Sequence, residues 1–225
     1  MEMRNCSRRK PAAEAGWDMI VRLARENPGE LTVVTLGRMT NLALALEKEP
    51  ALPRLVKNVV VMGGAVRAPG NVSPVSEANI AGAPEAADRV FLAGFDLTLV
   101  GIDVTGKTFL TPRHLDIAEK YWAEDCRPIL DYMREALKLY FAFACQNNRY
   151  LDRCPVHDPL AMVVAVDPSV VTIRKLPTRV ECGGTLCRGM VVSDFRERPI
   201  DAPFASICLD VDSERAVEEL LGAFL

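Results

Sequence analysis

The sequence predicts an α/β fold built on an open, mostly parallel sheet with helices on both faces. Three observations predict it. Short apolar, β-branched runs recur at 31–36, 59–62 and 97–100, a segment with helical spacing follows each run, and a glycine ends each run. Strands that are apolar on both sides are typical of a parallel sheet covered by helices on its two faces.

Over the first hundred residues, segments with helical spacing alternate with short apolar runs typical of strands. Apolar residues at helical spacing predict a helix over 11–26, and Asn27-Pro28-Gly29 ends it. A strand at 31–36 and a helix over 40–46 follow. The strand at 59–62 ends in Gly63-Gly64, and a helix over 84–93 leads into the strand at 97–100.

The remainder of the chain predicts three more helices, a further buried helix that begins near His157, and additional strands around a glycine-rich, hairpin-like stretch at 183–189. The helices are expected at 112–122, 128–147 and 213–224, and the strands at 170–173, 191–194 and 204–211. No repeat or interdomain linker is evident. We therefore predict one domain over 11–225, preceded by a basic, disordered tail at 1–10.

Composition excludes several classes of protein. The formal net charge of −3 provides no basic field for nucleic acid. No apolar run has the length that a membrane span needs. The 7 cysteines are scattered, odd in number and without a C-x-x-C pair, so we expect unpaired, reduced thiols, no zinc site and a cytoplasmic location.

His157 and Asp158 place a proton donor beside a carboxylate at the start of an apolar segment. The N-terminus of a helix favours an ionised carboxylate, and histidine can transfer a proton near neutral pH. A simpler interpretation is that Asp158 caps the helix and Pro159 is its first residue. These residues alone leave both interpretations open.

A second polar group follows the strand at 59–62. Asn71, Glu77 and Asn79 lie on a segment of low hydrophobicity, and residues two apart share a side of an extended chain. Several short polar side chains could converge on the vicinal hydroxyls of a sugar. The alternative is an ordinary solvated loop.

Six motifs, in order and covering nearly the whole chain from Pro11, resemble the inosine-uridine preferring nucleoside hydrolase family. They are Leu36-Gly-Arg-Met-Thr-Asn41, Val60-Val-Met-Gly-Gly64, Gly70-Asn71 with Glu77-Ala-Asn79, Pro84-Glu-Ala-Ala87, Gly101-Ile-Asp-Val-Thr105 and Val156-His-Asp-Pro-Leu-Ala161. The resemblance implies a Rossmann-like fold and calcium-assisted hydrolysis of ribonucleosides to ribose and free base. It also implies a small nucleoside as substrate and a homo-oligomer, either a dimer or a tetramer.

The resemblance implies roles for individual residues. His157 corresponds to the acid that protonates the leaving base, and Asp158 and the carbonyl of Leu36 correspond to calcium ligands. Asn71, Glu77 and Asn79 correspond to the residues that bind the ribose hydroxyls, and Met62 to a residue packed near the sugar. Arg149 resembles part of a segment near the base pocket, although a plain helix C-terminus explains it equally well. Gly101-Ile-Asp-Val-Thr105 is expected to be structural.

One family feature is missing. The family begins with a strand that ends in the cluster D-x-D-x-x-x-D-D, which supplies further calcium ligands and the base, whereas Asp18 is the only aspartate before Asp88 here. We therefore expect the first βαβ portion to be absent because the reading frame is truncated or mis-started. The alternative is a degenerate member that binds ribose or a nucleoside, or an interaction module that pairs through an exposed sheet edge.

Overall fold

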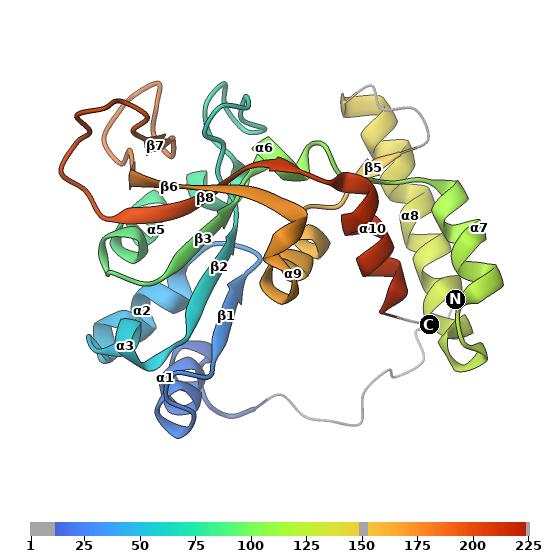
Figure 1. Cartoon of the computed structure of the whole chain (residues 1–225), viewed down its shortest axis with the longest axis horizontal. Helices are drawn as coiled ribbons and strands as arrows, with labels where there is room; N and C mark the ends of the chain where they lie inside the picture. The colour runs from blue at the N-terminus through green and yellow to red at the C-terminus, as the bar shows by residue number, and fades with distance from the viewer. Residues whose placement is uncertain (1–11, 149–152, 224–225) are drawn as a thin grey trace.

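The computed structural model describes residues 12–148 and 153–223. Its main sheet has six strands in the order β1-β2-β3-β8-β6-β7 (Figure 1). Strands β1, β2, β3 and β8 run parallel, whereas β6 and β7 are antiparallel to their neighbours. The strands are β1 (Thr32–Thr35), β2 (Asn58–Met62), β3 (Leu97–Val100), β6 (Val171–Val180), β7 (Val191–Ser193) and β8 (Phe204–Val211). The predicted open, mostly parallel sheet is confirmed.

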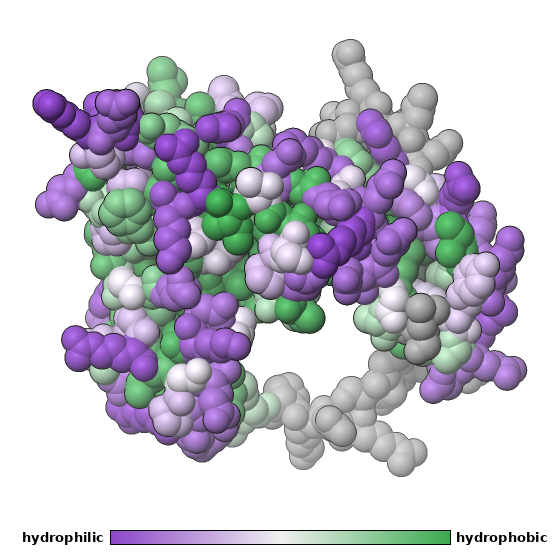
Figure 2. All heavy atoms as spheres, viewed as in Figure 1, coloured by the Kyte–Doolittle hydropathy of each residue, from purple (hydrophilic) through white to green (hydrophobic). Residues whose placement is uncertain are grey.

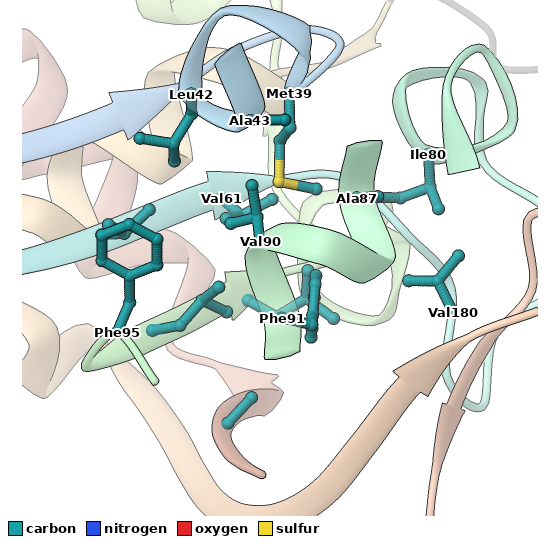
Figure 3. Close-up of a cluster of buried hydrophobic side chains, with 14 of the residues drawn as sticks. Met39, Leu42, Ala43, Val61, Ile80, Ala87, Val90, Phe91, Phe95 and Val180 are labelled. Atoms are coloured by element: carbon teal, nitrogen blue, oxygen red, sulfur yellow. The ribbon is translucent and has the colours of Figure 1, made fainter. Parts of the chain in front are cut away.

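Helices cover both faces of the sheet, as the sequence predicted (Figure 1). One face carries α1 (Gly16–Glu26), α2 (Thr40–Lys48), α3 (Leu52–Leu55) and α5 (Pro84–Leu92), which pack with the strands in the largest apolar cluster. Figure 3 shows part of it, with Met39, the N-cap residue of α2, directed toward Val61 of β2 and Val90 of α5. Burying one such side chain stabilises the fold by about 1.5–3 kcal/mol.

The opposite face is covered by α9 (His157–Val166) and α10 (Ser213–Gly222). Beyond α10 stand α7 (Pro112–Tyr121) and α8 (Arg127–Asn148), joined by the turn η1 (Glu124–Cys126). The outer side of α9 exposes Met162 and Val166, and Figure 2 shows apolar surface around this helix. No helix in the described ranges is long and apolar enough to cross a bilayer.

Short elements complete the fold. The strands β4 (Phe109–Leu110) and β5 (Cys154–Pro155) form an antiparallel pair, and η2 (Pro168–Val170) leads into β6. Two one-turn helices, α4 (Ala78–Ala81) and α6 (Ile102–Thr105), follow the ends of β2 and β3. The sequence did not predict these elements, because runs of two to four residues are too short to show a periodicity.

Three predicted boundaries were wrong. Helix α1 begins at Gly16 and not near Pro11, since Ala15 has the extended backbone of an N-cap residue. Strand β6 continues to Val180, well past 173, because its exposed central residues hide the apolar pattern while its backbone pairs with β8. The cap of α9 is Val156, so Asp158 is the second residue of the helix and the N-cap interpretation of Asp158 was wrong. The predicted tail at 1–10 lies outside the described residues, and the single domain remains a prediction.

Candidate active site

The carboxyl ends of β1, β2 and β3 lie at the same edge of the sheet, in the register Thr35↔Val61 and Met62↔Val100. Leu36 leaves β1 at this edge and is 40% exposed. The segment from Gly63 to Glu77 leaves β2 there, and α6 follows β3. Ligands of open parallel sheets bind at this edge. The site is therefore built from loops that the sheet brings together.

Gly64 makes the turn that follows β2. Its φ of +76° is unfavourable for residues with a Cβ, and a Cβ there would lie 2.7 Å from Cγ2 of Val191. The Gly64 amide donates to Oε2 of Glu77 over 2.9 Å. Gly63 and Gly64 thus let the chain turn tightly, and the amide of Gly64 anchors the Glu77 carboxylate.

Glu77 is buried, with 2% of its surface exposed. It is the N-cap of α4, and its Oε2 also accepts from the amides of Asn79 at 2.9 Å and Ile80 at 3.3 Å. The expectation of an extended segment across 77–79 was therefore wrong, and so was the alternative of a solvated loop for Glu77. Three amide donors hold this carboxylate in place.

Asn71 and Asn79 are tied by hydrogen bonds to helix α4 and to the end of β2. Nδ2 of Asn79 donates to the carbonyl oxygen of Met62 and contacts its Sδ, each at 3.2 Å. Oδ1 of Asn71 accepts from the amide of Ala78 at 3.0 Å. Met62 itself is buried in the core. The four residues expected at the sugar therefore form one hydrogen-bonded cluster.

Asp103, on α6, fixes the start of the loop that carries this cluster. Its carboxylate accepts from the amides of Val66 at 2.9 Å, Arg67 at 2.7 Å and Ala68 at 3.1 Å. Since Asp103 is buried, these bonds tie the segment after β2 firmly to the segment after β3. This agrees with the structural role expected for Asp103.

His157 begins α9 and reaches toward α6. Its Nδ1 lies 2.7 Å from Oγ1 of Thr105, a residue with 0% exposure. Burial lowers the pKa of His157, and the charges of Glu77 and Asp158 oppose that shift by raising it. The histidine therefore lies within the electrostatic reach of both carboxylates. Sequence reasoning missed Thr105, although its motif was noted, because it assigned the whole motif a structural role.

Asp158 projects from the first turn of α9 and is exposed. Burial of part of the side chain raises the pKa of its carboxyl, and the neighbouring His157 lowers it. The charge of Asp158 also contributes, after burial and Cys154, to a raised pKa of Tyr140 on α8.

The described residues supply few ligands for calcium. No group of three or more His, Cys, Asp or Glu side chains capable of holding a metal occurs within the described ranges. Asp158 and the carbonyl of Leu36 are hard oxygen donors of the kind that calcium takes, but calcium takes six to eight. Next to Leu36, the hydroxyl of Thr35 is buried without a hydrogen-bond partner in the described part of the chain. The donors are therefore of the type that suits calcium, but the described residues supply fewer oxygens than the ion takes.

Other residues named from the sequence lie elsewhere or were not placed. Arg149 lies outside the described residues. His114 forms a capping box with Thr111 at the start of α7, as expected of a residue at a helix start. Cys145, Cys154, Cys182 and Cys187 are free thiols in the described part of the chain.

The comparisons with known proteins show the family of the chain. The model of the inosine-uridine preferring nucleoside hydrolase family matches residues 2–218. The chain belongs to this family. It is 36% identical over 188 residues to the inosine-uridine preferring nucleoside hydrolase of Crithidia fasciculata, covering 84% of this chain and 58% of the relative. It is 34% identical to a probable uridine nucleosidase of Arabidopsis thaliana, covering 96% of this chain and 67% of that protein.

A solved plant nucleoside hydrolase superposes on the chain with a TM-score of 0.88 and 33% identity, covering 99% of this chain and 70% of the plant protein. The nucleoside hydrolase fold expected from the sequence is thereby confirmed. The chain spans little more than half the length of the Crithidia relative.

Proposed function

We propose that this member of the nucleoside hydrolase family hydrolyses the N-glycosidic bond of ribonucleosides to ribose and a free base. The observation that carries the proposal is His157, which Thr105 holds at the sheet edge within reach of the charges of Glu77 and Asp158. A proton donor close to buried negative charge is what glycosidic cleavage requires, since the base must leave while the sugar becomes positive.

The reaction breaks the bond between C1′ and the base nitrogen and joins C1′ to the oxygen of water. His157 protonates the departing base, and the proton that water loses balances the one that His157 gives. The transition state resembles an oxocarbenium ion, so the Glu77 carboxylate bonded to the Gly64 amide would stabilise it. Burial strengthens this effect because water does not screen the charge.

The sugar would be bound by the cluster of Asn71, Glu77 and Asn79 beside Met62. Its amide and carboxylate groups are held by the backbone bonds described above, so they need little reordering when ribose binds. Preorganisation of this kind lowers the entropic cost of binding. Arg149 is proposed to lie near the base.

Calcium is the proposed cofactor, with Asp158 and the carbonyl of Leu36 among its ligands and with sugar hydroxyls and water supplying further oxygens. When bound, calcium orients the ribose hydroxyls and makes water easier to deprotonate. The unpartnered hydroxyl of Thr35 next to Leu36 supports a polar occupant at this position.

Replacing Asp158 with Asn is expected to weaken calcium binding at least about tenfold, because the substitution removes the negative charge that offsets dehydration of the ion. Calorimetric titration of the purified chain with Ca²⁺ measures this directly. The matched control is Asp116→Asn, which changes an exposed carboxylate on α7. Equal calcium affinity in the Asp158→Asn variant and the wild-type chain would remove Asp158 from the ligand set.

The proposed activity is tested by incubating the chain with inosine or uridine in the presence of Ca²⁺. We expect equal amounts of free base, separated by chromatography, and of reducing sugar. Absence of both products across purine and pyrimidine nucleosides would overturn the proposal. Calorimetric binding of a nucleoside without turnover would support the alternative of a binding protein without catalysis.

A cytoplasmic location and a homo-oligomer, either a dimer or a tetramer, belong to the same proposal. The six cysteines in the described part of the chain are free, which suits a reducing compartment. The exposed apolar residues Met162 and Val166 on α9 offer a surface that a second subunit could cover.

A further inference from the structure

The hydroxyl of Thr105 has a partner that is unusual for its position. Thr105 ends the one-turn helix α6, and its amide already donates to the carbonyl of Gly101. A threonine in such a turn commonly directs its hydroxyl to a carbonyl one turn earlier. Thr108, three residues on, does so, with Oγ1 3.2 Å from the carbonyl oxygen of Val104. Thr105 instead places its Oγ1 2.7 Å from Nδ1 of His157.

This contact holds the orientation of the imidazole, and the Thr105 hydroxyl can either donate to Nδ1 or accept from it. A neutral imidazole carries its proton on one nitrogen only, and the partner of the other nitrogen decides which one. A hydroxyl that donates to Nδ1 leaves the proton on Nε2. When both nitrogens are protonated, the same hydroxyl oxygen accepts from Nδ1, so the ring keeps its orientation in both states.

The surroundings of Thr105 make the contact rigid. Thr105 is fully buried, and α6 is held from the other side by the three amides that donate to Asp103. Its β-branched side chain has few χ1 rotamers available. The hydroxyl therefore reaches His157 from a fixed backbone and without the entropy cost of ordering a long side chain.

We infer that Thr105 is a positioning residue that holds Nδ1 of His157 and thereby directs Nε2 toward the nucleoside base. The resting neutral ring carries its proton on Nε2. The doubly protonated ring is the acid: it passes the Nε2 proton to the base and keeps the Nδ1 proton, which then donates to Oγ1 of Thr105. Its effect on turnover rests on the proposed function, whereas its effect on the tautomer does not. Thr105→Val keeps the shape of the side chain and removes the hydroxyl, Thr105→Ser keeps the hydroxyl, and Thr108→Val is the matched control.

The first measurement is nitrogen NMR of ¹⁵N-histidine-labelled protein at one pH at which the imidazole is neutral. The chain has 2 histidines, so a His157→Ala spectrum assigns the signals. We expect protonated Nε2 and unprotonated Nδ1 in the wild-type, Thr105→Ser and Thr108→Val proteins. In Thr105→Val we expect averaged nitrogen shifts that report a mixture of tautomers. An unchanged tautomer in Thr105→Val would overturn the inference whether or not the protein hydrolyses nucleosides.

The second measurement is turnover. Thr105→Val should lower kcat for inosine by about 10–100-fold, the usual effect of removing the partner that orients a histidine, and leave KM nearly unchanged. A ribonucleoside analogue with a leaving group that needs no protonation should be hydrolysed almost as fast as by the wild-type protein. Thr105→Ser should restore kcat. An equal loss on both substrates, or no rescue by serine, would show a purely structural role and contradict the inference. If the wild-type chain hydrolyses neither substrate, the proposed function fails, and the NMR result still decides the role of Thr105.

Discussion

His157→Ala should slow hydrolysis of inosine by about 10²–10⁴-fold, the range in which a positioned general acid contributes. The same substitution should lower kcat far less for a ribonucleoside analogue whose leaving group departs without a proton. The expected difference arises because His157 is the half-buried imidazole within reach of the charges of Glu77 and Asp158, where a proton can be passed to the base. Steady-state kinetics on the two substrates, compared as kcat, measure it.

His114→Ala provides the control for this substitution. His114 caps α7 through Thr111, and changing it removes the other histidine of the chain without touching the sheet edge. Its kinetics should match those of the wild-type protein on both substrates. Equal losses for inosine and the activated analogue in His157→Ala would show that His157 does not act on the leaving group.

The second large effect is expected at Glu77, where stability and chemistry can be separated with two variants. Glu77→Ala removes the acceptor of three amides, those of Gly64, Asn79 and Ile80. An unsatisfied buried donor costs about 1–3 kcal/mol, so we expect a loss of unfolding free energy of at least about 3 kcal/mol. Urea denaturation, followed by circular dichroism, measures this loss.

Glu77→Gln keeps an oxygen that can accept from the same amides but carries no charge. Its unfolding free energy should lie much closer to the wild-type value, whereas its kcat for inosine should fall at least about tenfold, because the negative charge near the reacting sugar is lost. Glu218→Ala and Glu218→Gln, on the exposed side of α10, serve as controls. If Glu77→Ala unfolds at the same urea concentration as Glu218→Ala, the carboxylate does not anchor the loop.

The sequence predicted the sheet well where strands are buried on both faces. The strand at 97–100 and the strand at 204–211 have the same bounds in the structure. The predicted strand at 170–173 was too short, because Arg174 and Lys175 are exposed and interrupt the apolar pattern. The full length of β6 is set by its pairing with β8. Tertiary pairing of this kind leaves no local signature in the sequence.

For the site, the sequence identified residues more reliably than their geometry. Glu77 and Asn79 were expected side by side on an extended chain, but a one-turn helix connects them through the carboxylate of Glu77. Thr105 was missed because its partner, His157, lies far along the chain. Hydrophobic periodicity predicts helices and strands, but it does not predict single side-chain contacts such as these two. The assignment of His157, Glu77, Asn79 and Asp158 to ligand and proton chemistry remains a prediction.

The parallel pairing of β3 with β8 has a consequence for how the protein is made. Thr98 pairs with Ser206, so the central strand β3 gains its second neighbour only when the distant strand β8 has been synthesised. Until then a nascent chain carries an open β3 edge whose Leu99 is destined for the core. Pairings between distant segments form slowly and leave apolar edges open to aggregation. The yield of folded protein during expression should therefore rise when chaperones shield this edge, and it should fall when translation leaves the edge open for longer.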